Sequence, residues 1–132
     1  MSTSPMGWAP GDPWIAKGFK QAKTLNLGEV DIRLLPFPYF LATKFSAFFD
    51  RGLQDYWASK DYEDIIFLID NVPNFPKRVL NADEEVKAFL ISAFDVIMRK
   101  EELQEVILGN LPFEGQMSRY ERILESIKSI TR

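Results

Sequence analysis

The stretch PYFLATKFSAFFDR, residues 38–51, decides the fold. Prolines at positions 36 and 38 end the preceding extended segment, and Pro38 suits the first turn of a helix, where its missing N–H is not needed. Gly52 follows as the expected C-terminal cap. A rotation of 100° per residue gathers the apolar residues into one broad arc, formed by Leu41, Ala42, Phe45, Phe48 and Phe49. We therefore predict a helix over 38–51 that turns an aromatic face towards the core.

The same helix carries a second stripe, which contains Phe40, Lys44, Ala47 and Arg51. The two cations are seven residues apart, so they lie two turns apart on one face, with the small Ala47 between them. This arrangement suits an anion with spaced charges such as a polyphosphate, because Lys acts as a point charge and Arg as a bidentate fork. It is also typical of a solvated basic face. Both interpretations stay open.

A second helix is predicted to start after Ser59, an acceptable N-cap, and its first turns are acidic. Acidic groups at this positive end stabilise a helix for purely structural reasons. However, helical rotation places Asp61 on the apolar side, between Ile65 and Leu68, with Asp64 flanking it. We therefore expect Asp61 to be partly buried.

A buried Asp61 carboxylate needs a partner, because burying an unpaired charge costs several kcal/mol. Lys44 or Arg51 of the preceding helix is a suitable partner. In the structural interpretation, the carboxylate forms an ion pair that joins two helices. In the functional interpretation, it holds a phosphate-binding cation in place or accepts a proton from an attacking hydroxyl. The spacing favours neither interpretation.

The expected architecture is a single α+β domain over residues 1–132, in which a short N-terminal hairpin packs on about five helices. Residues 1–23 are expected to form an irregular lead-in, since positions 1–13 hold three prolines and two glycines. Apolar and polar residues alternate on both sides of Gly28, which predicts a hairpin over 24–35. Region 38–132 is expected to be helical, with helices near 38–51, 60–71, 81–99, 101–108 and 116–130.

The composition excludes several classes of site. The 132 residues include no cysteine and no histidine, so disulfides, thiolate or imidazole metal sites and Ser-His-Asp catalysis are impossible within them. The net charge of −3, with mixed signs along the chain, argues against binding duplex nucleic acid through a basic surface. The sequence shows neither a signal peptide nor an apolar run of about 20 residues. We expect a cytoplasmic protein with no membrane contact.

Part of the chain resembles the AbiEii-type nucleotidyltransferases, the toxins of abortive-infection type IV toxin–antitoxin systems. The similarity extends from about Gly18 to Asn74 and, more weakly, over the helical tail. It is carried by residue types and spacing that agree over nearly thirty positions: PYFLATKF at 38–45, DRG at 50–52, DY at 55–56 and SKDYEDII at 59–66. This two-part pattern is fairly specific to the family.

The resemblance implies roles for five residues. Lys44 and Arg51 match the Lys and Arg of the family's third motif, while Lys60, Asp61 and Asp64 match the Lys-Asp-x-x-Asp helix start of its fourth. The family is thought to use these motifs for nucleotide binding and catalysis. By this resemblance, Asp61 and Asp64 are the candidate catalytic residues, and the three basic residues are the candidate nucleotide-binding residues.

Other family motifs are missing. Members carry a Gly-Gly motif and an Asp-x-Asp strand that hold a divalent metal and the nucleotide phosphates, whereas this sequence has no Gly-Gly pair and its nearest match is Asp31-Ile32-Arg33. We expect the sequence to start just after that strand, as a fragment, a split gene or a degenerate descendant would. We thus expect no metal ligand in this chain and no activity by itself. Mg²⁺ and a nucleoside triphosphate are expected as cofactors only with the missing half present.

The predicted function is therefore that of a nucleotidyltransferase-like protein with a remnant nucleotide site, whose partners would be a nucleotide, the missing N-terminal half or an antitoxin. The alternative is a non-catalytic interaction module, in which the charged cluster is an internal ion-pair network. An exposed patch over Phe40, Phe48, Tyr56 or Trp57 would favour that alternative. A third possibility is a homodimer that covers surfaces left open by the missing half.

Overall fold

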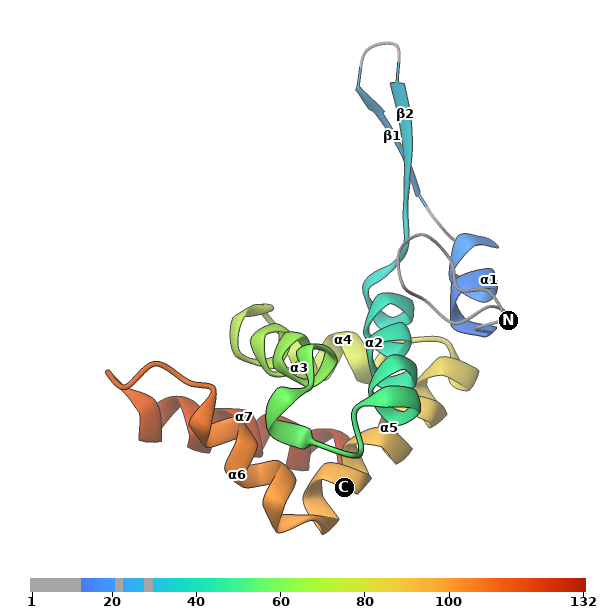
Figure 1. Ribbon diagram of the computed structural model, residues 1–132. Coiled ribbons are helices and arrows are strands. Elements are labelled where there is room, and N and C mark those ends of the chain that lie inside the picture. The colour runs from blue at the N-terminus through green and yellow to red at the C-terminus, as the bar shows by residue number, and fades with distance from the viewer. Residues whose placement is uncertain (1–12, 21–22, 28–29) are drawn as a thin grey trace.

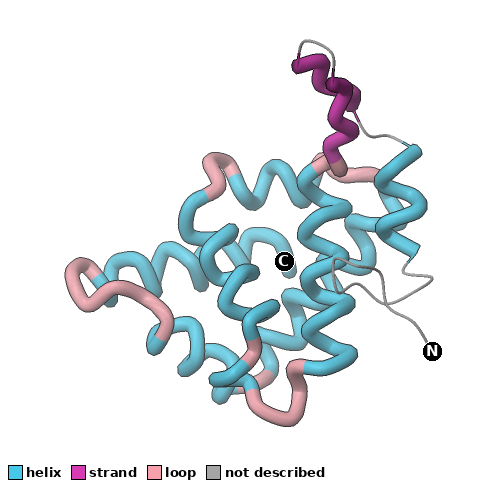
Figure 2. Tube along the Cα trace, turned by 45° about the horizontal axis from the view of Figure 1, so that its top comes forward, coloured by secondary structure: helices cyan, strands magenta, loops and turns pink. Residues whose placement is uncertain are grey.

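The computed structural model describes residues 13–20, 23–27 and 30–132, and helices dominate these ranges (Figure 1). The helices are joined by short connections and pack around one another (Figure 2). In chain order the elements are α1 (Pro13–Lys20), β1 (Lys23–Leu27), β2 (Val30–Leu34), α2 (Phe37–Arg51), the 3₁₀ helix η1 (Tyr56–Ala58), α3 (Lys60–Asn71), α4 (Phe75–Leu80), α5 (Glu84–Arg99), α6 (Glu101–Gly109) and α7 (Gln116–Thr131).

The prediction of an α+β domain with a hairpin packed on about five helices is wrong. Within the described residues the core is formed by seven α-helices. Strands β1 and β2 pair antiparallel with each other, with Leu25 opposite Ile32, and Figure 1 shows this ribbon standing clear of the helical body. Two strands alone do not make a layer that covers a core. The amphipathic helices bury their apolar faces against one another instead.

The predicted irregular lead-in is also wrong where the structure describes it. Pro13–Lys20 forms α1, with a proline at the first position, where helices accept it. Trp14 is buried, with its ring centroid 5.0 Å from that of Phe89 and 6.5 Å from that of Tyr39. Gly18 allows α1 to approach α2, because a Cβ at this position would lie 2.8 Å from the Cβ of Tyr39. Residues 1–12 of the predicted lead-in lie outside the described residues.

The aromatic face predicted for 38–51 forms the centre of the core. Leu41, Ala42, Phe45 and Phe48 of α2 are completely buried. The Phe48 ring stacks on Tyr62 of α3 with centroids 4.8 Å apart, and the Phe45 ring meets Phe94 of α5 edge-on at 5.0 Å. These ring pairs fix α2 against both helices, since such contacts add to the stability gained by burial. The predicted aromatic arc is confirmed.

Helix α4 was not predicted. The predicted helices leave a gap between 71 and 81, a segment that contains Pro73 and Pro76, but Pro76 stands in the first turn of α4, where a proline is tolerated. Phe75 and Val79 are buried in the core, so tertiary packing stabilises a helix of only 6 residues. The other helices predicted in region 38–132 are present, with ends within a few residues of those expected.

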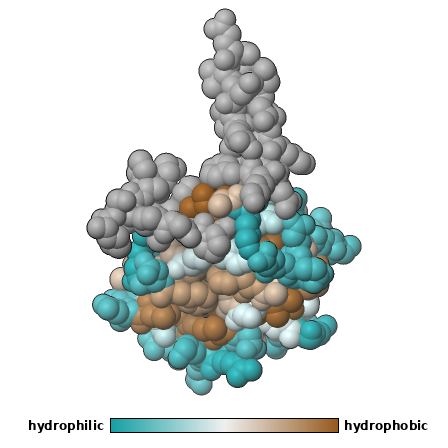
Figure 3. Space-filling model, turned by 90° about the vertical axis from the view of Figure 1, so that its right-hand side faces the viewer, coloured by the Kyte–Doolittle hydropathy of each residue, from teal (hydrophilic) through white to brown (hydrophobic). Residues whose placement is uncertain are grey.

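Apolar side chains also reach the surface. Figure 3 shows a band of them on the face turned by 90° from the view of Figure 1. An exposed patch over Phe40, Phe48, Tyr56 or Trp57 would favour an interaction module, and these four residues differ in exposure. Phe48 is completely buried, Phe40 and Tyr56 are partly buried, and Trp57 is 56% exposed. Among the described helices, none has the length and apolar character needed to cross a bilayer.

Candidate functional site

The connection between α2 and α3 positions the candidate site. Gly52 ends α2, and its N–H donates to the carbonyl of Phe48. Glycine suits this position because a Cβ there would lie 2.9 Å from the backbone carbonyl oxygen of Phe48 and 2.7 Å from the Ser59 hydroxyl oxygen. Asp55 accepts hydrogen bonds from the N–H groups of Trp57 and Ala58, which fixes η1. The short turn therefore brings the end of α2 close to the start of α3.

Ser59 caps α3 as predicted, since its hydroxyl accepts a hydrogen bond of 3.1 Å from the N–H of Tyr62. The cap fixes the rotation of the first turn and thereby the direction in which Asp61 points. The Asp61 side chain is only 10% exposed. The expectation that Asp61 is partly buried, drawn from helical rotation alone, is confirmed.

Arg51 of α2 is the partner of Asp61. The guanidinium donates through Nε to one carboxylate oxygen at 3.0 Å and through Nη2 to the other at 3.4 Å. This two-point contact orients the arginine plane as well as neutralising the buried charge. The Arg51 side chain is 51% exposed. Asp61 therefore holds a guanidinium that remains accessible to solvent.

Lys44 and Asp64 form a second pair between α2 and α3. Lys44 Nζ lies 2.9 Å from Asp64 Oδ2, and the two side chains are 20% and 34% exposed. The same ammonium lies 5.6 Å from the centroid of the Phe40 ring, within the range of a cation–π contact. An ammonium has three N–H donors, so Lys44 can hold Asp64 and contact an anion at the same time.

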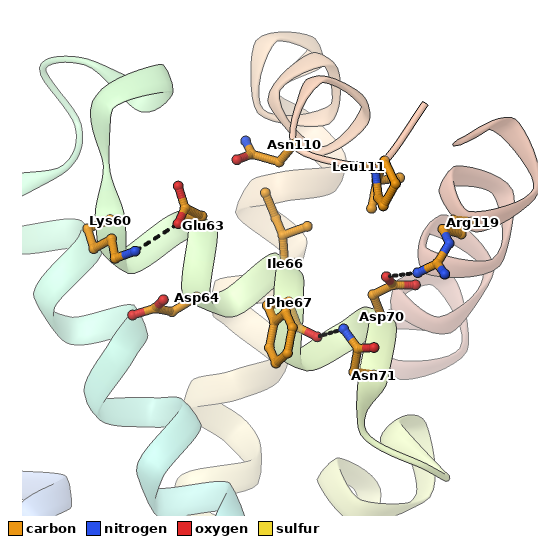
Figure 4. A pocket seen from close by; sticks show the side chains of 11 residues that line it. Lys60, Glu63, Asp64, Ile66, Phe67, Asp70, Asn71, Asn110, Leu111 and Arg119 are labelled. Atoms are coloured by element: carbon orange, nitrogen blue, oxygen red, sulfur yellow. Dashed lines mark hydrogen bonds and ion pairs between the residues drawn. The ribbon is translucent and has the colours of Figure 1, made fainter. Parts of the chain in front are cut away.

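Lys60 is the most loosely held of the predicted residues. Its side chain is 77% exposed, and its ammonium lies 2.9 Å from Glu63 Oε1 (Figure 4). This hydrogen bond, followed by the negative charges of Glu63 and Asp64, raises the pKa of Lys60 above its usual value. The residue therefore stays cationic at the entrance of the site at neutral pH.

All five predicted site residues line one open cleft of about 410 Å³. Three of them are cations and two are carboxylates, which gives a local charge of +1 in a chain whose net charge is −3. The N-terminal end of α3 borders the cleft through Ser59, Lys60 and Asp61, and a helix N-terminus favours negative charge. The complete lining is Lys44, Arg51, Gly52, Ala58, Ser59, Lys60, Asp61 and Asp64.

Two further hollows adjoin this cleft. One, of about 280 Å³, is lined by Phe40, Lys44, Asp64, Phe67 and Leu68. The other, of about 660 Å³, lies between α3, the loop after α6 and the start of α7, and Figure 4 shows its lining. Asp64 lines all three spaces, and Phe67 lines the latter two.

Phe67 was not predicted as a site residue. The signal available in the sequence was its position three residues after Asp64, which places both on one face of the helix. Asn110 and Arg119, in the hollow of about 660 Å³, come from segments distant in sequence and give no local signal.

The two carboxylates have different chemical environments. Asp61 is enclosed and gives both oxygens to Arg51, so its effect on a bound molecule would pass through the orientation of that guanidinium. Asp64 is more exposed and borders all three of these spaces. It is the better placed of the two to accept a proton from a hydroxyl.

The cleft does not fit a divalent metal. Mg²⁺ requires oxygen ligands in near-octahedral arrangement, whereas both carboxylates here already bond to cations. Within the described part of the chain, no three acidic side chains are placed to hold a metal ion. The cleft therefore supplies no ligand set for Mg²⁺.

Comparisons of the chain with protein-family models, curated proteins and solved structures found no match.

Proposed function

We propose that the cleft between α2 and the start of α3 binds the polyphosphate group of a nucleoside triphosphate, as in a nucleotidyltransferase-like protein. The observation that carries the proposal is the convergence of Lys44, Arg51 and Lys60 on one open cleft. These cations come from two helices, and each is held by a carboxylate at 2.9–3.0 Å. Polyphosphate, with its spaced charges, matches this spread of donors better than a single carboxylate does.

The ion pairs prepare the cations for binding. Arginine and lysine lose considerable rotamer freedom when they bind an anion. Here Asp61 and Asp64 already restrict Arg51 and Lys44, so less entropy remains to be lost on binding. The carboxylates also oppose the binding of anions by repulsion. We therefore expect moderate affinity, which falls as salt concentration rises.

The proposal covers binding and does not extend to transfer by this chain. The resembled family places its metal on acids that the sequence does not contain in the expected pattern, and the cleft itself does not fit Mg²⁺. If the metal-binding half is supplied by another chain, the expected reaction is nucleotidyl transfer to a hydroxyl, and Asp64 is the candidate proton acceptor.

The proposal is tested by calorimetric titration of inorganic tripolyphosphate and ATP into the pure protein at neutral pH. Lys44→Ala and Arg51→Ala should each lower the affinity for tripolyphosphate by about tenfold or more, because hydrogen bonds to charged groups contribute about 1.5–3 kcal/mol. Lys87→Ala and Arg99→Ala are matched controls, since each removes a cation from an ion pair within a single helix, α5. These controls should leave the affinity unchanged.

Two outcomes would contradict the proposal. The first is the absence of saturable binding up to millimolar ligand. The second is an equal loss of affinity in Arg51→Ala and Arg99→Ala, which would indicate a nonspecific charge effect. In either case the pairs Arg51–Asp61 and Lys44–Asp64 would be interpreted as structural links between α2 and α3.

A further inference from the structure

The smaller hollow beside the cleft has an aromatic lining. Its volume of about 280 Å³ is close to the lower limit, about 300 Å³, of small-molecule sites. Phe40 comes from α2, and Phe67 and Leu68 come from α3. The hollow shares Lys44 and Asp64 with the cleft. A single ligand is therefore able to contact both spaces across this ion pair.

The order of side chains along the two helices also places the aromatic hollow next to the cationic cleft. From its C-terminal end backwards, α2 presents Arg51, Lys44 and Phe40. From its start forwards, α3 presents Asp61 to Arg51 and Asp64 to Lys44. Phe67 follows Asp64 by one turn and shares the hollow with Phe40. The lining therefore changes in one direction from charged to aromatic.

The exposed position of Phe67 is not sufficient evidence by itself, because single apolar residues are common on protein surfaces. Phe67 is 64% exposed, and its ring extends from α3 between Asp64 and Asn71 in Figure 4. What distinguishes it is that the ring borders a hollow that shares Lys44 and Asp64 with a cationic cleft. Phe113, which is 91% exposed, lines neither space.

We propose that Phe67, with Phe40 opposite, forms a stacking site for the base of the nucleotide whose phosphates lie in the cleft. The inference rests on the proposed function and adds the ligand class, a purine or pyrimidine nucleotide rather than a polyphosphate alone. Base stacking tolerates different bases, because every base has a π-face. The hollow is lined by no side-chain amide or hydroxyl, so the site accepts more than one base.

The test compares ATP with inorganic tripolyphosphate, which has the phosphates but no base. Both are titrated calorimetrically into the wild-type protein, Phe67→Ala and Phe67→Leu. The leucine variant keeps an apolar side chain and removes the ring. Phe113→Ala is the matched control, a phenylalanine that is exposed and lies outside the hollow. Thermal unfolding verifies that each variant is folded. Folded variants are expected because the Phe67 and Phe113 side chains are both exposed.

The expected result is a loss of about tenfold in ATP affinity for Phe67→Ala and Phe67→Leu, from lost stacking on the ring. Tripolyphosphate affinity should stay unchanged in both, and Phe113→Ala should bind both ligands like the wild type. The inference is overturned if Phe67→Ala and Phe67→Leu keep wild-type ATP affinity, or if they lose affinity equally for ATP and tripolyphosphate. Failure of the wild type to bind tripolyphosphate or ATP overturns the proposed function as well, so the two failures are distinguishable.

Discussion

At its last turn α3 presents Asp70 to two arginines of α7, whereas at its first turns it presents Asp61 and Asp64 to cations of α2. Asp70 Oδ2 lies 2.6 Å from Arg119 Nη1 (Figure 4), and its other oxygen bonds to Arg122. The Asp70 side chain is only 5% exposed. At this end one carboxylate links two arginines from a helix 49 and 52 residues further along the chain.

The two ends of α3 therefore use the same kinds of groups in different proportions. The α7 end concentrates two cations on one enclosed carboxylate, which is the arrangement of a structural clamp. The α2 end gives each cation its own carboxylate and lets both cations line an open cleft. An ion pair on a helix is thus poor evidence for a site by itself, and the convergence of three cations on one open cleft is the better criterion.

The largest expected effect is on stability and concerns the clamp. Asp70→Ala leaves Arg119 and Arg122 without their shared partner, and we expect a loss of about 2 kcal/mol in the free energy of unfolding. This is below the roughly 3–5 kcal/mol seen when a fully buried pair is broken, because the two arginines are 39% and 60% exposed. Urea denaturation measures the change.

The control for Asp70→Ala is Asp95→Ala, which removes an exposed pair with Arg99 inside α5. We expect a loss of about 0.5 kcal/mol or less for this control. Asp70→Ala should also leave the tripolyphosphate affinity unchanged, because Asp70 does not line the cleft. Equal destabilisation in the two variants would show that the α7 end is not a clamp.

The sequence predicted the α2 end of this comparison but not the α7 end. Local rotation within one helix predicts the burial of Asp61 and offers Lys44 or Arg51 as its partner, and the structure shows that the partner is Arg51. Asp70 and its two arginines are far apart in sequence. Their meeting depends on the packing of α3 against α7, which periodicity does not reveal.

The fold class was also mispredicted because it depends on contacts between segments far apart in sequence. Alternation around Gly28 indicated extended strands, and paired strands occupy 23–27 and 30–34, but where such a ribbon lies relative to the helices is a long-range property. The short helices α1 and α4 were missed because both begin at or next to prolines, which were interpreted as breaks. Burial of Trp14 and Phe75 stabilises them, and tertiary packing of this kind overrides local propensity.

A smaller effect is expected for Tyr62, which links the α2 end of α3 to α6. The Tyr62 hydroxyl donates a buried hydrogen bond of 2.8 Å to the carbonyl of Leu103. Tyr62→Phe removes this bond and leaves the carbonyl without its donor, so we expect a loss of about 1 kcal/mol at neutral pH. Denaturation of the variant and the wild type at several pH values measures it.

The pH dependence of Tyr62 has a definite sign. Burial, and next the nearby Tyr120, raises the pKa of the Tyr62 hydroxyl well above its usual value of about 10. The folded protein therefore retains this proton when the unfolded chain releases it. The stabilising effect is complete below about pH 10 and is lost as pH rises through the folded pKa, by up to about 1.4 kcal/mol per pH unit. Tyr62→Phe should decline less steeply above pH 10, and parallel curves would contradict this account.

The smallest expected effect concerns Asp64. This carboxylate can weaken anion binding by repulsion or strengthen it by positioning Lys44, and the variant Asp64→Asn distinguishes the two effects. Asp64→Asn removes a negative charge beside the proposed phosphate site, so tripolyphosphate should bind roughly threefold more tightly, within the range of about 0.2–1 kcal/mol that exposed ion pairs contribute. Loss of the pair with Lys44 should lower stability by about 0.5 kcal/mol or less. Glu105→Gln makes the same change in net charge on the exposed side of α6, and should leave the affinity unchanged. Weaker binding in Asp64→Asn would instead show that the carboxylate acts mainly by positioning Lys44, and the α2 end would then resemble the α7 clamp more closely.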